Sequence, residues 1–283
     1  MVKKIVITLV SLILLLVVAY NVTLVYVDNN ISQKIPDNVF NDCKKVWSSR
    51  GFYDTVAEQN SIKSVKRGQA LGYQGYEIDL FYDVKTNRFI VSHDRPTKDE
   101  QGNLQYTEKE GEILTLEKLF KKTAKDTYFW LDYKNLDRIS PETTAIAVKR
   151  LQVISNVDGV KERIYIEGSN PLRLSMYTDA GFKTILGMHP PYEDNILSSL
   201  GVNIFKLVYY FNNITALAMN SGSQNSLIYG PQTEKLLAGI PVFLFHIPND
   251  EKLINYFLSK KDVRVLLIDG HKKVNRADMN SCQ

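Results

Sequence analysis

The chain has 283 residues, of which 44% are hydrophobic and 23% are charged, the balance of a folded globular protein and not of a disordered or fibrous one. Its 35 Lys and Arg residues stand against 31 Asp and Glu residues, and a net charge of +4 spread along the chain does not indicate a nucleic-acid partner. Two cysteines are too few for a disulfide framework or a zinc cluster. We expect one globular domain of roughly 200–250 residues behind an apolar N-terminal segment.

Residues 1–30 have the pattern of a membrane anchor or a signal segment. Lys3 and Lys4 precede Ile5–Val27, an uncharged run of 23 residues. As a helix, this run would rise roughly 34 Å, enough to cross a hydrocarbon core of about 30 Å. The positive-inside rule predicts a single-pass anchor with its N terminus in the cytoplasm and the domain extracytoplasmic. Cleavage of a signal peptide, which would leave the domain secreted or periplasmic, is the alternative, although no A-x-A pattern follows the run.

The rest of the chain divides into a polar linker, residues 31–43, and one domain, residues 44–283. Cys43 and Cys282 lie near the two ends of this domain. Outside the cytoplasm they could pair and tie its termini together, or remain independent thiols. Their spacing does not decide between the two.

Short apolar runs typical of buried parallel strands alternate with helical patterns along the domain. The expected strands are Lys45–Ser48, Tyr76–Phe81, Arg88–Ser92, Tyr128–Tyr133, Arg163–Glu167, Lys183–Gly187, Ile204–Tyr209, Ile240–Phe245 and Val263–Ile268. The expected helices are Ser61–Gln74, Leu116–Ala124, Pro141–Val153, Leu172–Ala180, Glu193–Leu200, Glu234–Leu237 and Glu251–Ser259. About eight strand-then-helix units favour a (β/α)₈ TIM barrel over an open sheet. The two common glycine-rich nucleotide-binding motifs are absent from the sequence.

Functional side chains of such a barrel follow the carboxyl ends of its strands. Glu77 and Asp79 alternate within one expected strand, so both carboxylates share a face. Asp132 and Lys134 have the same spacing at the carboxyl end of another expected strand, so their side chains point the same way. Clustered carboxylates stay ionised together only beside a cation, and this pattern predicts a hard divalent metal with oxygen ligands. A lone E-x-D pair is usually a solvated face; it is the ordered set on successive strand ends that indicates a site.

Several motifs together resemble the glycerophosphodiester phosphodiesterase family. Arg50-Gly51 is similar to its H-R-G motif, and Gln59-Asn60-Ser61 to its E-N-T motif. Gly75-Tyr76-Glu77-Ile78-Asp79 is similar to its G-x-x-x-E-x-D-V motif, and Ile90-Val91-Ser92-His93-Asp94 to its V-x-H-D motif. Asp132-Tyr133-Lys134 is similar to its E-x-K motif. Its V-x-x-W-T-V-N and I-I-T-D-x-P segments are similar to Phe243–Asn249 and Val265–Gly270. The likeness covers about residues 44–273.

The resemblance implies a TIM barrel that binds Ca²⁺ or Mg²⁺ and cleaves a phosphodiester with two histidines as general acid and base. By position, it implies that Glu77, Asp79 and Asp132 hold the metal, and that Arg50 and Lys134 contact the phosphate. The third ligand is Asp where the family has Glu, as also occurs in the related sphingomyelinase-D-like branch.

The catalytic histidines match the family only in part. The resemblance gives His93 the role of the second histidine, which protonates the leaving alkoxide, but Ser49 stands where the family has the first. A serine hydroxyl cannot act as a general base near pH 7. Gln59 replaces the E-N-T glutamate, and His189 or His246 could in principle supply the base, although each is more often structural.

We therefore expect a metal-dependent phosphoric diester hydrolase that acts outside the cytoplasm on a lipid-derived or glycerol-phosphate diester. The alternative from another class is a catalytically impaired barrel that binds metal and phosphodiester without turnover. A scaffold with a vestigial site is a weaker third hypothesis.

Overall fold

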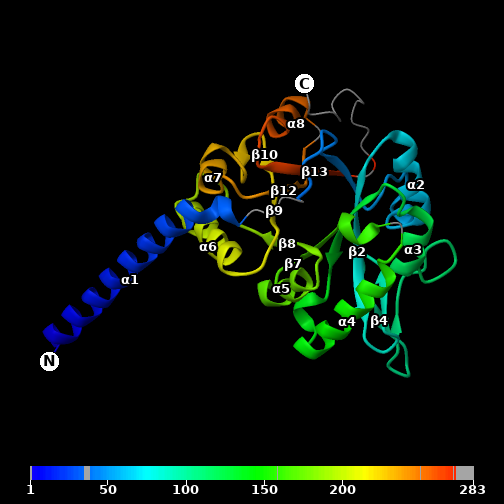
Figure 1. Ribbon diagram of the computed structural model, residues 1–283, viewed down its shortest axis with the longest axis horizontal. Coiled ribbons are helices and arrows are strands. Elements are labelled where there is room, and N and C mark those ends of the chain that lie inside the picture. Colours follow the sequence, from blue (N-terminus) through cyan, green and yellow to red (C-terminus); the bar gives the residue numbers. More distant parts are fainter. Residues whose placement is uncertain (1, 35–38, 158, 249, 270, 272–283) are drawn as a thin grey trace.

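The structure, a computed structural model, describes residues 2–34, 39–157, 159–248, 250–269 and 271. Within these ranges, eight parallel strands form a closed barrel that helices surround (Figure 1). In the order in which they pair, the barrel strands are β1 (Val46–Ser49), β2 (Gly75–Asp83), β6 (Tyr128–Tyr133), β7 (Ile164–Gly168), β8 (Lys183–Met188), β9 (Ala216–Asn220), β12 (Val242–Phe245) and β13 (Val263–Asp269). β1 pairs with both β2 and β13, which closes the barrel and confirms the predicted TIM-barrel fold.

A helix follows each of the first seven barrel strands. These helices are α2 (Ile62–Leu71), α3 (Leu116–Thr123), α4 (Pro141–Ile154), α5 (Pro171–Asp179), α6 (Ser198–Phe211), α7 (Pro231–Leu236) and α8 (Glu251–Leu258). Five of them begin at a side chain that accepts a hydrogen bond from the first turn: Ser61, Thr115, Ser140, Asn170 and Asp250. Such caps satisfy backbone N–H groups that have no partner within the helix, so they fix where each helix starts.

Short strands and 3₁₀ turns lie in the segments between the main strands and helices. β3 (Arg88–Val91) pairs antiparallel with the end of β2 and stands outside the barrel ring. The two-stranded pairs are β4 (Thr97–Lys98) with β5 (Leu104–Gln105), and β10 (Gly222–Ser223) with β11 (Ser226–Leu227). The 3₁₀ turns are η1 (Ile31–Gln33), η2 (Val56–Glu58), η3 (Leu136–Arg138) and η4 (Val160–Arg163).

Alternation along each strand creates two apolar layers. In β6, Phe129 and Leu131 pack in the layer that the helices cover, whereas Trp130 belongs to the interior cluster of the barrel. The interior cluster also contains Val39 and Phe40, from the segment expected to be a linker. The Phe40 backbone N–H donates to the Tyr165 hydroxyl at 2.6 Å. Part of that segment is therefore packed into the domain.

The expected strand Ile204–Tyr209 is wrong, because these residues lie within helix α6. The strand of this unit is β9, which begins twelve residues after Ile204, and the expected helix Glu193–Leu200 overlaps α6 only at its end. α6 is apolar toward the barrel and apolar on its outer side, so its sequence lacks the alternation of polar and apolar residues that normally marks a helix. Arg88–Ser92 is also not a barrel strand, since β3 occupies most of it.

Helix α1 (Val2–Asn30) projects away from the barrel (Figure 1). It is long and apolar enough to cross a membrane, with a mean hydropathy of 2.7 in a window that is wholly unburied. The C-terminal end of α1 contacts the domain, because Val27 and, just after the helix, Ile31 are buried. The question of whether Cys43 pairs with Cys282 lies partly outside the described residues, since Cys282 is not among them.

Candidate active site

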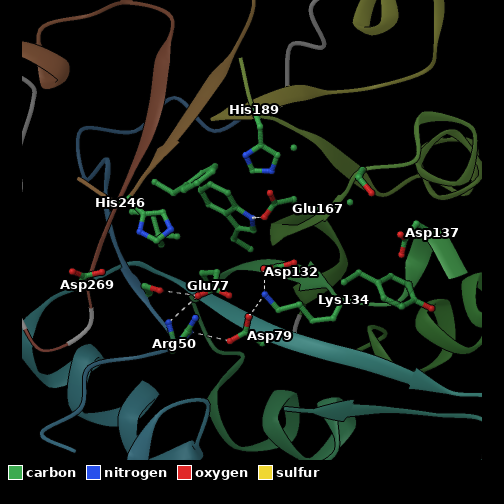
Figure 2. Close-up of a pocket in the computed structure, with 18 of the residues that line it drawn as sticks. Arg50, Glu77, Asp79, Asp132, Lys134, Asp137, Glu167, His189, His246 and Asp269 are labelled. Atoms are coloured by element: carbon green, nitrogen blue, oxygen red, sulfur yellow. Dashed lines mark hydrogen bonds and ion pairs between the residues drawn. The ribbon is translucent and has the colours of Figure 1, made fainter. Parts of the chain in front are cut away.

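A cavity of about 520 Å³ opens at the carboxyl ends of the barrel strands (Figure 2). Six of the seven predicted site residues line it: Ser49, Arg50, Glu77, Asp79, Asp132 and Lys134. The seventh, His93, lines a neighbouring depression instead, and Arg50 borders both. The structure therefore brings six of the seven predicted residues to one cavity.

Strand register brings the acidic residues together. Ser49 of β1 pairs in register with Glu77 of β2, and Asp79 pairs with Asp132 of β6. Asp132 in turn pairs with Glu167 of β7. Because the barrel strands are parallel and adjacent, residues that are far apart in the chain form continuous rows across the mouth.

The turn after β1 is shaped to hold Glu77. Arg50 and Gly51 both have positive φ, 56° and 76°, which swings the chain back over the strand end. A side chain at Gly51 would place its Cβ 2.2 Å from the Ser64 Oγ, so only glycine fits there. In this turn, the Ser49 hydroxyl donates to Glu77 Oε2 at 2.9 Å and the Arg50 backbone N–H donates to the same oxygen at 3.1 Å. Glu77 is thus held by a serine hydroxyl and a backbone amide.

Asp79 lies at the centre of the charged cluster and is fully buried. Asn60 Nδ2 donates to its Oδ2 at 2.7 Å, and Arg50 Nε lies 3.1 Å from that oxygen. Lys134 Nζ lies 2.5 Å from Asp79 Oδ1 and also forms an ion pair with Asp132. Two cations therefore partly compensate the three carboxylates.

The electrostatics of the site favour an additional positive charge. Burial, followed by the charges of Asp79 and Asp132, raises the pKa of Glu77 well above its usual range. Burial also raises the pKa of Asp132. Burial would lower the pKa of Lys134, but the nearby carboxylates outweigh it and raise that pKa instead. The acids are thus harder to ionise and the ammonium harder to neutralise, as expected where negative charge is in excess.

The three acids fit a divalent cation. Each of Glu77, Asp79 and Asp132 offers one oxygen, and these atoms all lie within 4.8 Å of one another. Carboxylate oxygens are the donors that hard divalent cations prefer. A divalent cation among them would also stabilise the ionised form of every ligand.

Residues that sequence reasoning did not select complete the cavity. Glu167 lines it, is partly buried and accepts a hydrogen bond from Trp130 Nε1 at 2.6 Å. Burial, with the charge of Asp132, raises the pKa of Glu167 to about 8. A signal was present, since Glu167 is an acid at the end of an otherwise apolar expected strand, as Asp132 is. Asp269, at the end of β13, also lines the cavity.

Two histidines lie across the cavity from the acidic cluster. His189 follows β8 and His246 follows β12, and both line the main cavity. In Figure 2, His189 lies beyond Glu167 as seen from Asp132, and His246 lies between His189 and Asp269. His246 has a positive φ of 53°, which is uncommon for histidine. His93 is 45% exposed and its Nδ1 lies 3.0 Å from Asp94 Oδ1, in the neighbouring depression.

Comparisons with known proteins bear on the fold. No protein-family model and no curated protein matches the sequence. Solved structures do match. A glycerophosphodiester phosphodiesterase from Parabacteroides distasonis ATCC 8503 is 18% identical, with a TM-score of 0.54 over 81% of this chain and 94% of that one. A phosphodiesterase from Oleispira antarctica, in complex with the product sn-glycerol-3-phosphate, is 12% identical, with a TM-score of 0.56 over 82% and 94%.

A glycerophosphodiester phosphodiesterase from Agrobacterium tumefaciens str. C58 is also similar, at 10% identity and a TM-score of 0.52 over 85% of this chain and all of that one. At these identities the likeness concerns the course of the backbone. The chain therefore has the TIM-barrel fold that these phosphodiesterases share.

Proposed function

We propose that the barrel mouth binds Ca²⁺ or Mg²⁺ together with a phosphodiester, and that the protein is a phosphoric diester hydrolase of the glycerophosphodiester phosphodiesterase type. The observation that carries this proposal is the meeting of Glu77, Asp79 and Asp132 within 4.8 Å, in a cavity that Arg50 and Lys134 also line. Carboxylates attract a cation and the two basic side chains attract an anion, so the site suits a phosphate bound to a metal. The bound sn-glycerol-3-phosphate of the Oleispira enzyme supports the same ligand class.

Each charged residue has a role in this proposal. Glu77, Asp79 and Asp132 would hold the cation, which when bound supplies Lewis-acid polarisation of the phosphoryl group. Arg50 and Lys134 contact the non-bridging phosphate oxygens, orient the diester and stabilise the charge that develops during cleavage.

Proton transfer needs groups that titrate near neutral pH. The Ser49 hydroxyl does not, and it already donates to Glu77, so we assign it the positioning of that carboxylate. We assign the proton acceptor to His189 or His246, since both line the cavity, and the proton donor to His93. Of these, His93 requires the substrate to reach the neighbouring depression.

The second candidate function is binding of the cation and the phosphodiester without turnover. Two observations favour it. β1 ends at Ser49, whose hydroxyl donates a hydrogen bond to Glu77, and His93 does not line the main cavity. A barrel of this kind would retain its charged cluster and lack an efficient acid–base pair.

We further propose that α1 remains attached as a single-pass anchor, with the N terminus in the cytoplasm and the barrel outside. Lys3 and Lys4 on the N-terminal side of the span support this orientation. The contacts at the other end of α1 support its retention over signal cleavage, because Val27 is buried and Asp28 forms an ion pair with the buried Lys206. Cleavage between Val27 and Asp28 would remove the buried Val27 from the domain, and cleavage after Asp28 would also leave Lys206 without its carboxylate partner.

The test is an assay of the full chain in nanodiscs against glycerophosphodiesters and lysophospholipids, with Ca²⁺, Mg²⁺ or chelator. Asp79→Asn is the matched variant, because it removes one charge and keeps the shape of the side chain. Turnover that chelator abolishes and Asp79→Asn lowers by at least about 100-fold would support the hydrolase. Metal-dependent binding of sn-glycerol-3-phosphate without turnover would support the second function, and neither binding nor turnover would contradict both.

Ser49→His separates the two functions further. If the barrel is a silenced hydrolase, an imidazole at this position should raise turnover by about 10²–10⁴-fold. If His189 or His246 already acts as the base, the same substitution should leave turnover unchanged or lower it by disturbing Glu77.

A further inference from the structure

Helix α6 presents an apolar face to the outside of the barrel. Leu197, Leu200, Ile204 and Phe211 are exposed on it, and Ile196 extends the row into the β8–α6 loop. Their exposed fractions run from 46% to 95%. The spacing of three, four and seven residues is that of a single helix face. The row therefore forms one stripe along the full length of α6, which we call the α6 stripe.

No charged side chain interrupts the α6 stripe. Lys206 is the one charged residue of α6, and it is 4% exposed and paired with Asp28. Every other helix around the described barrel carries an exposed charged residue, for example Lys63 in α2, Lys121 in α3, Lys149 in α4, Asp179 in α5, Lys235 in α7 and Glu251 in α8. Proteins surrounded by water seldom leave such a continuous apolar row uncovered.

The α6 stripe is continuous with the end of α1. The rings of Tyr26 and Tyr210 meet edge to face with their centroids 6.0 Å apart, and Lys206 Nζ lies 2.6 Å from Asp28 Oδ1. Lys34 Nζ donates to backbone carbonyls at the end of α6, among them that of Tyr210 at 2.9 Å. These contacts fasten α1 to the C-terminal half of α6, so α1 leaves the barrel at a fixed position.

We propose that the α6 stripe lies on the surface of the lipid bilayer that α1 crosses, with its apolar side chains in the interfacial layer. This inference rests on the anchor that we proposed above. Tyr26 stands near the end of the uncharged run Ile5–Val27, so its ring and that of Tyr210 lie at the depth of the headgroups, where tyrosine is enriched. A helix with one apolar and uncharged face is the element that binds this layer.

The same stripe leads to the mouth of the barrel. The β8–α6 loop runs from His189, which lines the cavity, to Ile196, which is 95% exposed. The stripe thus starts on the side of the barrel from which the cavity opens, because α6 begins after the loop that follows the carboxyl end of β8. With α6 on the bilayer, the pocket opens at the membrane surface, which favours a phosphodiester carried by a lipid over a freely diffusing one.

Tryptophan fluorescence tests the bilayer contact without requiring activity. The chain has two tryptophans, Trp47 and Trp130, and both are buried in the barrel interior. The variants Leu200→Trp and Ile204→Trp of the full chain are reconstituted in vesicles of phosphatidylcholine with or without brominated acyl chains. The fluorescence added by each new tryptophan is compared between the two lipids, with the unsubstituted chain as background.

Two further variants serve as controls. Val56→Trp places the probe at a site that is 74% exposed, near β1, which lies opposite β8 in the barrel. Leu14→Trp places it in the middle of α1 and reports whether the span is inserted.

We expect brominated lipid to reduce the added fluorescence of Leu200→Trp and Ile204→Trp at least about twofold, as for Leu14→Trp, and to leave Val56→Trp unchanged. Quenching of Leu14→Trp without quenching at 200 and 204 would overturn the inference and leave the anchor intact. If the added fluorescence of the two α6 variants instead changes with protein concentration, a second copy of the chain covers the stripe and the inference is wrong. Absence of quenching in Leu14→Trp would overturn the anchor and the inference together, and would leave the proposed chemistry of the pocket untouched.

Discussion

Asn60 is the side chain that fixes Asp79, and its replacement by alanine should destabilise the barrel strongly. Asn60 is fully buried. Its Nδ2 donates to Asp79 Oδ2 at 2.7 Å, and its Oδ1 accepts the Asp79 backbone N–H at 3.0 Å. Asn60→Ala removes both bonds at once and leaves a buried carboxylate and a buried amide each with one partner fewer.

The size of the effect follows from these contacts. A hydrogen bond to a charged group contributes about 1.5–3 kcal/mol, and a buried N–H left without a partner costs about 1–3 kcal/mol. Arg50 and Lys134 still neutralise Asp79 in the variant, so we expect a loss of about 3–5 kcal/mol and not a larger one. Because Asp79 would be less firmly held, affinity for a divalent cation should also fall, by about 10–100-fold.

Asn87→Ala is the matched control. Asn60 and Asn87 both have a φ of 53°, so the cost of placing alanine in the left-handed region is common to the two variants. Asn87 is exposed, and its Oδ1 accepts one hydrogen bond from the Tyr82 hydroxyl at 2.6 Å. The free energy of unfolding is measured by urea denaturation in chelator, and cation affinity by calorimetry. A loss in Asn60→Ala within about 1 kcal/mol of that in Asn87→Ala would refute this role for Asn60.

Two further predictions concern the cavity carboxyl of Glu167 and the ion pair between Asp28 and Lys206. Burial raises the pKa of Glu167 to about 8, so the folded state holds a proton that the unfolded state releases, and stability should fall as pH rises from about 4.5 to about 8. Glu167→Gln should remove this fall in stability, which amounts to at most roughly 5 kcal/mol at 1.36 kcal/mol per pKa unit. The free energy of unfolding is measured by urea denaturation in chelator at pH 5.5 and 8.5. A dependence on pH that Glu167→Gln leaves unchanged would contradict this prediction. Asp28→Ala should destabilise the barrel by about 1–2 kcal/mol, because Lys206 is buried while Asp28 is half exposed and partly screened. Adding Lys206→Met to Asp28→Ala should recover most of that loss in stability. If the double variant is no more stable than Asp28→Ala, the ion pair between Lys206 and Asp28 is not what stabilises the α1–α6 junction.

Much of the barrel could be predicted because its strands are buried on both faces and its helices carry local start signals. The runs that became β2, β6 and β13 consist mostly of aromatic and branched apolar residues, and Ser140-Pro141 marks the start of α4. The same logic predicts that Glu77-x-Asp79 and Asp132-x-Lys134 meet, since Glu77 and Asp79 lie on β2, Asp132 lies on β6 and Lys134 directly follows β6, and all four residues line one cavity.

The errors arose where tertiary contacts override local pattern. The pattern of Ile204–Tyr209 predicts a strand within α6 because the outer face of this helix is as apolar as its inner face, and β9, Ala216–Asn220, is only a short apolar run after it. Glu167 was missed because a single acid at a strand end is common, and only its register with Asp132 makes it part of the site. The packing of Val39 and Phe40 into the barrel interior also depends on long-range contacts that no local pattern reveals.

Direct titration of the full chain in nanodiscs with Ca²⁺ and with Mg²⁺, followed by calorimetry, tests most directly that Glu77, Asp79 and Asp132 form a cation site. We expect one cation per chain, an affinity that falls at least about tenfold in both Asp79→Asn and Asp132→Asn, and tighter binding when sn-glycerol-3-phosphate is present. Absence of binding, or binding that neither substitution weakens, would contradict a metal site at the mouth of this barrel.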